Sequence, residues 1–262
     1  MPGIDTEELL TLALDLADRA GALVLEALDA AHAGVDTKTS GTDMVSDVDR
    51  ASERLIVEAL RAARPGDSVV GEEGGAHEGT SGVRWVIDPL DGTTNYLYRL
   101  PAFTVSIAAE IDGRREVGVV ADPVHAETFA ARRGGGATCN GSPIGCSTKN
   151  ELTTALVGTG FSYDAERRRH QAGVLTVVLP RVRDIRRAGA ASLDLCWVAC
   201  GRLDAFYEQG LQPWDFAAGA LIASEAGATV GDLDGGPPSG AFTMAAGPAL
   251  FGPLRQLLVE AF

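Results

Sequence analysis

The chain carries the sequence WVIDPLDGTT at residues 85–94, and this stretch sets the local fold on which the rest of the interpretation depends. Its proline fixes its own φ angle and pushes the preceding residue, Asp88, toward an extended conformation. Gly92 then permits a sharp turn directly after a second carboxylate, Asp91. Thr93 follows and can open a helix, whose first backbone N–H groups are free to bind an anion. The stretch therefore predicts two carboxylates beside a phosphate-binding turn.

The spacing of the two aspartates distinguishes two kinds of phosphatase chemistry. Phosphatases that use an aspartyl nucleophile carry Asp-x-Asp-Gly-Thr after an apolar strand, with one residue between the carboxylates. In this chain two residues separate Asp88 from Asp91. The second carboxylate then points in a different direction relative to the first. This geometry favours joint metal binding and disfavours an aspartyl-phosphate intermediate.

Two further acidic positions follow short apolar runs, namely Glu72-Glu73 and Asp215. Carboxylates at such places are typical of sites built on a rigid scaffold. Several carboxylates in one pocket repel one another unless cations or protons neutralise them. Oxygen ligands without thiols favour Mg²⁺, Mn²⁺ or Ca²⁺ over zinc, and divalent ions of this kind activate water for in-line displacement. We therefore expect direct attack of a metal-activated water on a small phosphate ester.

The bulk properties restrict the remaining possibilities. The chain has 262 residues, 45% of them hydrophobic, which is enough for a substantial core. The formal net charge of −14 argues against nucleic acid as a partner, because phosphate backbones bind basic surfaces. The apolar run at residues 9–28 is interrupted by four charged side chains, so we expect no membrane span or signal peptide and a cytoplasmic location. The four cysteines and four histidines lack the spacing of a zinc site.

Helix and strand patterns alternate along the chain, which predicts a mixed α and β enzyme without flexible linkers. Thr104–Glu110 and Glu116–Ala121 are expected to form a hairpin around a turn at Ile111–Arg115. The predicted helices cover residues 7–30, 46 or 47–63, 191–199, 214–226 and 249–261. The other predicted strands cover residues 68–70, 83–87, 155–157, 182–185 and 203–207, and residues 31–45 are expected to form a loop or a short strand.

The sequence resembles the inositol monophosphatase family nearly end to end. Four of the family's motifs occur in the family's order, at Lys38–Asp49, Gly71–Glu73, Trp85–Tyr96 and Trp214–Gly227. The resemblance implies a layered αβαβα sandwich of the sugar-phosphatase type, forming one compact unit over residues 1–262. Two packed halves are expected within it, 1–150 with the metal and phosphate site on an antiparallel sheet, and 151–262 with a mixed sheet on the substrate side. The resemblance also implies a homodimer and sensitivity to lithium.

The resemblance assigns roles to the matching positions. A first Mg²⁺ would be held by Glu72, Asp88 and the carbonyl of Leu90, and a second by Asp88, Asp91 and Asp215. Glu72 would help hold a third ion through water, and Mn²⁺ is a possible substitute. Glu72 and Thr93 would orient and deprotonate the attacking water, with Asp49 nearby and Lys38 as a compact charge beside the site. The backbone amides of Gly92 and Thr93 would hold the phosphate.

The organic part of the substrate is expected to contact a second group of residues. These are Asp91, Gly189, Ala190, Ala191, Glu208 and Asp215. The Gly189–Ala191 segment with Glu208, and the second threonine after Gly92, favour myo-inositol 1-phosphate as the substrate. Histidinol phosphate, fructose 1,6-bisphosphate and a nucleotide phosphate remain alternatives, and Arg167–Arg169 would either reach a second phosphate or lie on a solvated helix face. The alternative from a different functional class is a regulatory protein that binds other proteins and whose phosphatase activity is secondary.

Overall fold

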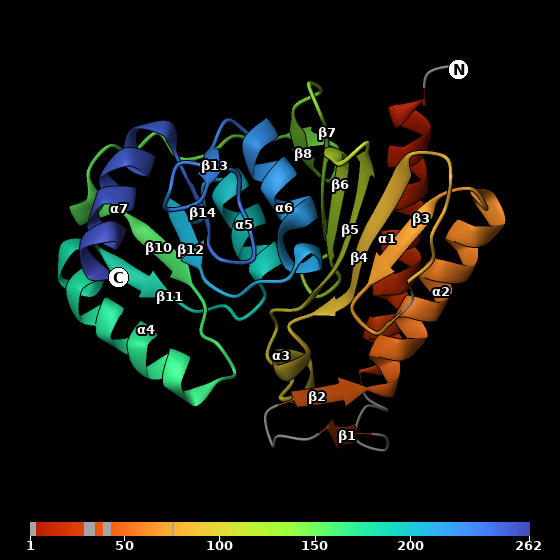
Figure 1. Cartoon of the computed structure of the whole chain (residues 1–262), viewed down its shortest axis with the longest axis horizontal. Coiled ribbons are helices and arrows are strands. Elements are labelled where there is room, and N and C mark those ends of the chain that lie inside the picture. The colour runs from red at the N-terminus through yellow and green to blue at the C-terminus, as the bar shows by residue number, and fades with distance from the viewer. Residues whose placement is uncertain (1–3, 29–34, 39–42, 75) are drawn as a thin grey trace.

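The computed structural model describes residues 4–28, 35–38, 43–74 and 76–262. These residues form five layers, in the order helices, sheet, helices, sheet, helices (Figure 1). The layered αβαβα sandwich expected from the sequence is therefore confirmed. The expected loop or short strand at residues 31–45 lies partly outside the described residues. Within its described part, β1 (Val35–Lys38) and β2 (Asp43–Ser46) pair as an antiparallel ribbon.

The first layer consists of α1 (Thr6–Ala27) and α2 (Asp47–Ala63). Asp5 caps α1 by accepting a hydrogen bond from the Glu7 amide at 2.8 Å. One stripe of α1, which includes Leu9, Leu16 and Val24, is fully buried against the first sheet. Each apolar side chain buried there contributes on the order of 1.5–3 kcal/mol. Leucines recur along α1 at helical spacing, and this pattern predicts both the helix and the face that it buries.

The second layer is a seven-stranded sheet whose strands follow one another in sequence order. Only the β3–β4 pair is parallel among its strand pairs in the described residues. The predicted hairpin is present, and its turn places Asp112 at φ 50° and Gly113 at φ 78°, as a tight turn between antiparallel strands requires. The strands are β3 (Ser68–Gly71), β4 (Val83–Asp91), β5 (Thr104–Ile111), β6 (Arg114–Asp122), β7 (Glu127–Arg132), β8 (Ala137–Cys139) and β9 (Ser142–Pro143).

The central layer consists of α5 (Ala191–Ala199) and α6 (Pro213–Glu225), which pack between the two sheets (Figure 1). α6 approaches β6 so closely that position 118 must be glycine. A Cβ on Gly118 of β6 would lie 2.8 Å from the Ala218 carbonyl oxygen of α6. A core of buried residues from both sheets and both helices fills this layer. The central helices therefore fix the two sheets relative to one another.

The fourth and fifth layers are a mixed five-stranded sheet and the helices α4 (Ala165–Val178) and α7 (Pro248–Ala261) outside it. The strand order is β11-β10-β12-β14-β13. The pairs on either side of β10 are parallel and the pairs on either side of β14 are antiparallel. The strands are β10 (Leu156–Thr159), β11 (Asp184–Arg186), β12 (Ala205–Glu208), β13 (Thr229–Gly231) and β14 (Thr243–Ala246). Two short 3₁₀ helices, Leu152–Thr154 and Leu179–Arg181, connect these elements. The division of the chain into halves near residue 150 stays a prediction.

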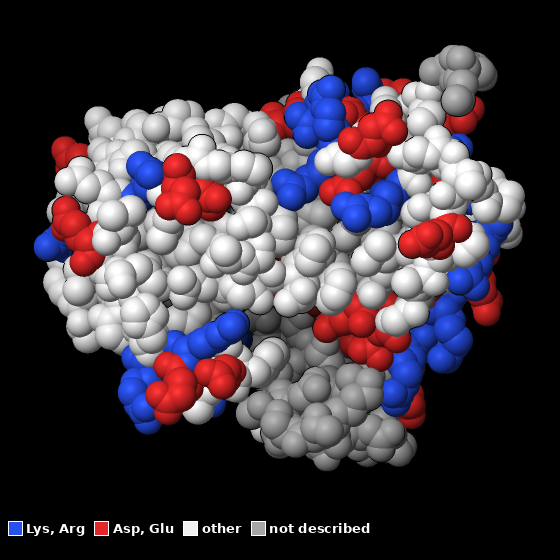
Figure 2. Space-filling model, viewed as in Figure 1, with Lys and Arg blue, Asp and Glu red and all other residues white. Residues whose placement is uncertain are grey.

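Charged side chains on the face shown in Figure 2 are mostly interspersed, with Lys and Arg beside Asp and Glu. Ion pairs among the described residues include Arg84 with Glu110 and Arg202 with Glu127. No extended basic surface is visible among the described residues of that face. None of the described helices has both the length and the apolar composition needed to cross a membrane.

Candidate active site

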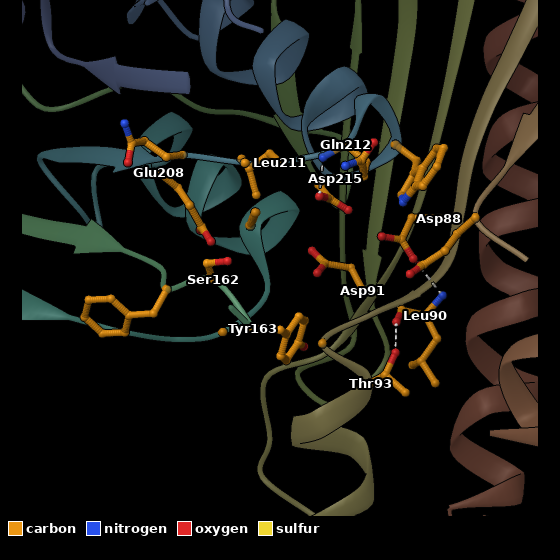
Figure 3. Close-up of a pocket in the computed structure, with 18 of the residues that line it drawn as sticks. Asp88, Leu90, Asp91, Thr93, Ser162, Tyr163, Glu208, Leu211, Gln212 and Asp215 are labelled. Atoms are coloured by element: carbon orange, nitrogen blue, oxygen red, sulfur yellow. Dashed lines mark hydrogen bonds between the residues drawn. The ribbon is translucent and has the colours of Figure 1, made fainter. Parts of the chain in front are cut away.

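A cleft of about 630 Å³ lies between the end of β4 and the segments that lead into α5 and α6 (Figure 3). Pockets of this size are typical for small-molecule ligands. Ten of the residues singled out from the sequence line it: Glu72, Asp88, Leu90, Asp91, Gly92, Thr93, Gly189, Ala191, Glu208 and Asp215. The fold thus brings together residues from positions 72 to 215 of the chain.

The end of β4 has the sharp local geometry that its sequence predicted. The pairing of β4 with β5 is regular up to Asp88 and resumes only at Asp91, which lies opposite Thr104. Gly92 has φ 89° and precedes the short helix α3 (Thr93–Leu97). A Cβ at Gly92 would lie 2.7 Å from the Ala102 carbonyl oxygen, so that only glycine fits this turn. The Thr93 hydroxyl donates a hydrogen bond to the Leu90 carbonyl at 3.0 Å, which closes the turn.

Asp88 lies at the centre of the carboxylate cluster. It is 1% exposed, and its Oδ1 accepts a hydrogen bond from the Leu90 amide at 3.1 Å. Burial, followed by the charges of Glu72 and Asp91, raises its pKa well above the usual range. Its carboxyl lies within hydrogen-bond reach of both Glu72 and Asp215 when one partner carries a proton. Asp88 therefore lies close to two other carboxyl groups, and their like charges oppose ionisation of all three without a counter-charge.

The two carboxylates beside Asp88 have different surroundings. Glu72 keeps contact with solvent at the rim of the cleft, although desolvation by the surrounding protein and then the charge of Asp49 raise its pKa. Asp215 is half-buried in the first turn of α6, where its Oδ2 accepts a hydrogen bond from the Gln212 amide at 2.7 Å. Burial and the charge of Asp91 raise the pKa of Asp215 to about 8. Both groups would ionise more readily if a cation entered the cleft.

Asp91 is the most firmly held carboxylate of the cluster. Its Oδ2 accepts hydrogen bonds from the Ser192 amide at 2.8 Å and from the Ser192 hydroxyl at 2.6 Å, at the start of α5. Burial raises the pKa of Asp91 to about 6, and these hydrogen bonds limit the rise. Asp91 is therefore the member of the cluster that is most ready to carry a charge at neutral pH.

Asp49 lies behind the cleft rather than in its wall. It is 2% exposed, and its Oδ2 accepts a long hydrogen bond from the Thr93 hydroxyl at 3.4 Å. Burial and then the charge of Glu73 raise its pKa to about 8. The proximity of Asp49 to Thr93 agrees with the expected arrangement. Lys38 belongs to β1, but its side chain lies outside the described part of the structure.

The opposite wall of the cleft comes from distant segments. Glu208 ends β12, and burial raises its pKa to about 8, which the charge of Arg187 opposes. A Cβ on Gly160 would collide with the Glu208 carboxylate, so this glycine makes room for it. Gly189 and Ala191 line the cleft, whereas Ala190 is buried behind them.

Several residues of this wall were not predicted from the sequence. Arg187 is the residue of this group that carries a positive charge. Among the described residues, it is the one Lys or Arg side chain that lines the cleft. It follows another arginine in an arginine-rich chain, so no sequence signal distinguished it. By contrast, the sequence predicts that the segment of residues 160–163 faces the substrate, although its residues indicate no particular ligand, and Phe161, Ser162 and Tyr163 do line the cleft. Gln209, Gly210, Leu211 and Gln212 line the cleft as well and were also not predicted.

Arg167–Arg169 lie in the first half of α4. The sequence left open whether these arginines contact a second phosphate or lie on a solvated helix face. Arg169 pairs with Glu166, and both side chains are largely exposed. Arg168 donates hydrogen bonds to the carbonyls of Ser162 and Tyr163 and so supports the cleft loop. The prediction of a solvated helix face thus fits Arg169, while Arg168 holds a loop.

The chemistry of the cluster suits a divalent cation that prefers oxygen ligands. The donor set consists of carboxylates and the Leu90 carbonyl, and the described residues that line the cleft include no cysteine or histidine. The raised pKa values show that the cluster needs either protons or cations. Among the described residues, no three acidic, His or Cys side chains already surround a single point as metal ligands. The residues therefore fit the ion by the chemistry of their oxygen donors.

Fold and site together define a class: a layered phosphatase with a carboxylate cluster beside a glycine turn. The family model described as "Inositol monophosphatase family" matches residues 5–260. The chain belongs to the inositol monophosphatase family, whose members are phosphatases and are generally metal-dependent. The family resemblance inferred from the motifs is confirmed.

The relatives carry two kinds of names. "Inositol-1-monophosphatase" of Mycobacterium leprae is 44% identical over 95% of this chain and 93% of that protein. "Nus factor SuhB" of Escherichia coli strain K12 is 43% identical over 87% of this chain and 86% of that protein. Among solved structures, the extragenic suppressor protein suhB of Bartonella henselae has a TM-score of 0.93 and 34% identity over 97% of this chain and 100% of that one. The inositol monophosphatase of Anabaena has a TM-score of 0.85 and 35% identity, over 98% and 97%.

Proposed function

We propose that the protein is a Mg²⁺-dependent phosphatase that hydrolyses myo-inositol 1-phosphate to inositol and inorganic phosphate. One observation carries the proposal. The tight turn at Gly92 and the carboxylates Asp88 and Asp91 form one wall of a cleft, and Glu72 and Asp215 join them there from distant segments. A phosphate-binding turn and a cation-binding cluster are thereby adjacent.

The cluster offers ligands for two to three ions. Glu72, Asp88 and the Leu90 carbonyl would hold one, and Asp88, Asp91 and Asp215 another. Glu72 would help hold a third through water, and Mn²⁺ is expected to substitute. Bound divalent cations would neutralise the cluster, lower the pKa of water and offset the negative charge of the phosphate.

The chain's own groups perform the positioning and the proton transfer. The Thr93 hydroxyl, held by the Leu90 carbonyl at 3.0 Å, orients a water molecule for in-line attack on phosphorus. The Glu72 carboxylate accepts the proton that this water loses. Asp49 supports Thr93 from behind at 3.4 Å, and Lys38 is expected to add positive charge nearby. The free amides of Gly92 and Thr93, at the start of α3, bind the phosphoryl oxygens.

The opposite wall favours a polyol as the organic part of the substrate. Glu208, Asp91 and Asp215 present hydrogen-bond acceptors for ring hydroxyls, and the Gly189–Ala191 backbone adds donors and acceptors. Arg187 is the one cation among the described lining residues, and it lies near Asp91 and Glu208, which oppose its charge. Among the described lining residues no cation other than Arg187 is available to bind a second phosphate, so the lining disfavours a bisphosphate substrate.

A panel of phosphate esters assayed with Mg²⁺ tests the substrate. We expect the highest kcat/KM for myo-inositol 1-phosphate, above histidinol phosphate, fructose 1,6-bisphosphate and nucleoside monophosphates. A much higher value for one of the others would replace inositol phosphate as the substrate while leaving the phosphatase chemistry in place. No Mg²⁺-dependent hydrolysis of any ester would contradict the proposed function itself.

A regulatory role is the second candidate, because several relatives at 43% identity are named Nus factor SuhB. A strongly acidic chain suits a protein partner better than direct RNA binding. An Asp88→Asn variant separates the two roles, since it removes catalysis without changing the outer surface. A regulatory phenotype that survives in this variant would support the second role, and one that disappears with activity would contradict it. The homodimer, the lithium sensitivity and the cytoplasmic location stay predictions.

A further inference from the structure

Ser192 connects the cleft to the core, although it does not itself line the cleft. It is fully buried in the first turn of α5. Its amide and its hydroxyl both donate to Oδ2 of Asp91, at 2.8 and 2.6 Å. The same hydroxyl lies 2.7 Å from the hydroxyl of Thr104, which is also fully buried. A chain of hydrogen bonds therefore runs from β5 through α5 to a cleft carboxylate.

The direction of these hydrogen bonds follows from the charge of Asp91. An ionised carboxylate only accepts, so the Ser192 hydroxyl must donate its proton to Asp91. The Ser192 oxygen then accepts from Thr104, and both hydroxyl dipoles point toward the carboxylate. Neighbouring donors in a buried chain strengthen one another, and hydrogen bonds to a charged group are the strong ones.

The register of the sheet explains why Thr104 is available. Asp91 lies opposite Thr104 where β4 and β5 pair again after the irregularity that begins at Asp88. The same irregularity lets the chain turn at Gly92 and present Asp91 to the cleft, where Figure 3 shows its carboxylate. The two residues that bond through Ser192 are thus also a cross-strand pair.

We propose that Ser192, supported by Thr104, is a positioning residue that fixes Oδ2 of Asp91 and leaves Oδ1 as the oxygen offered to a divalent cation. The proposal rests on the proposed function, because it assumes that Asp91 binds Mg²⁺. It goes beyond that function by assigning roles to two buried hydroxyls outside the cleft. Without them the Asp91 side chain keeps only backbone donors at α5 and can rotate away from the orientation that a cation needs.

Direct cation binding to the full-length protein tests the proposal, measured by Mn²⁺ electron paramagnetic resonance titration and by Mg²⁺ calorimetry. Loss of an outer hydrogen bond to a ligand typically weakens metal binding about 10–100-fold. We expect a loss within this range for Ser192→Ala and a smaller loss for Thr104→Val. Thr104→Ser keeps the hydroxyl and should bind nearly as the wild type does. Saturating Mg²⁺ should restore most of kcat in Ser192→Ala, because the ligand itself remains.

Thr243 provides the matched control. It is also fully buried, and its hydroxyl donates to the Ser239 carbonyl at 3.0 Å in the other sheet. Thr243→Val removes a buried hydroxyl whose hydrogen bond goes to Ser239 and not to Asp91, and it should leave cation affinity unchanged. Thermal unfolding without Mg²⁺ checks that each variant folds, and the Thr104→Val and Thr104→Ser pair decides the matter if Ser192→Ala does not fold.

The outcomes separate this inference from the proposed function. If the wild type binds neither cation nor phosphate ester, the proposed function fails. If the wild type is active but Ser192→Ala and Thr104→Val bind cations as tightly as it does, only the positioning role is overturned. Equal losses in Thr104→Val and Thr243→Val would also overturn it, because they would reflect general destabilisation.

Discussion

The two walls of the cleft are built in different ways. The phosphate side consists largely of seven consecutive residues, Asp88 to Thr94, whose geometry depends on a proline, a glycine at φ 89° and a bond from Thr93 to Leu90. The opposite wall, which we propose to bind the polyol and call the polyol side, is assembled from the loop after β10, the entry to α5, the end of β12 and the entry to α6. Local backbone geometry thus forms the proposed phosphate-binding turn, whereas the packing of distant elements brings Glu72 and Asp215 to it and forms the opposite wall. Changes on the two sides should accordingly produce different kinetic effects.

The largest effect is expected for Asp88→Asn on the phosphate side. The variant removes a charge and a ligand from the centre of the cluster, so we expect kcat to fall by about a thousandfold or more. Release of inorganic phosphate from myo-inositol 1-phosphate measures it. Asp15→Asn on the exposed face of α1, where Asp15 pairs with Arg19, serves as the control and should keep full activity. Near-normal turnover in Asp88→Asn would contradict the assignment of the cluster.

Gly92→Ala tests whether backbone geometry controls the phosphate side. The new Cβ would meet the Ala102 carbonyl oxygen at 2.7 Å in a positive-φ conformation. We expect a loss of about 1–3 kcal/mol in unfolding free energy and roughly a hundredfold lower kcat, because the phosphate-binding amides shift. Denaturant unfolding and steady-state kinetics measure both quantities.

Gly113→Ala is the matched control for that variant. Gly113 also has a positive φ, 78°, but a Cβ added there in the hairpin turn would meet open space, with none of the described residues beyond its chain neighbours within 4 Å. The variant should lose about 1 kcal/mol and keep its kcat. Equal kinetic losses in the two variants would show that the turn at Gly92 has no special role in phosphate binding.

Glu208→Gln tests the polyol side. Above about pH 8 the Glu208 side chain is ionised. A carboxylate accepts hydroxyl hydrogen bonds more strongly than an amide does, so KM for myo-inositol 1-phosphate at that pH should rise about tenfold with little change in kcat. An aryl phosphate without ring hydroxyls should show no such rise. A fall in kcat on both substrates would instead show that Glu208 takes part in catalysis. The two walls would then not have separate roles.

The smallest expected effect is the change in thermal stability of the cation-free protein with pH. The pKa values of Asp91, Asp215 and Glu208 are raised in the folded state, to about 6, 8 and 8, mainly by burial. Between about pH 4 and pH 8 the folded state therefore holds more protons than the unfolded state. Stability of the cation-free protein should fall as pH rises through this range, by several degrees in Tm.

Adding Mg²⁺ should reverse that trend, because the cluster would then be ionised in the folded state and stability would be lost as pH falls. Thermal unfolding with EDTA and with Mg²⁺ at several pH values checks both signs. Stability that rises with pH in the presence of EDTA would show that the carboxylates are not held as close together as the structure places them.

The sequence by itself determined the local parts of this protein. Periodic leucines predicted α1, Ile111–Arg115 predicted a hairpin turn that the structure narrows to Asp112-Gly113, and residues 88–94 predicted the phosphate side, because each depends on neighbours in the chain. The strands Thr229–Gly231 and Thr243–Ala246 were missed because three or four residues show too little alternation, and α4 was not placed because few of its residues are buried. Only the tertiary structure put Ser192 and Thr104 behind Asp91, and Arg187 in the cleft. Those contacts join residues about a hundred positions apart, and packing of the central helices between two sheets creates them.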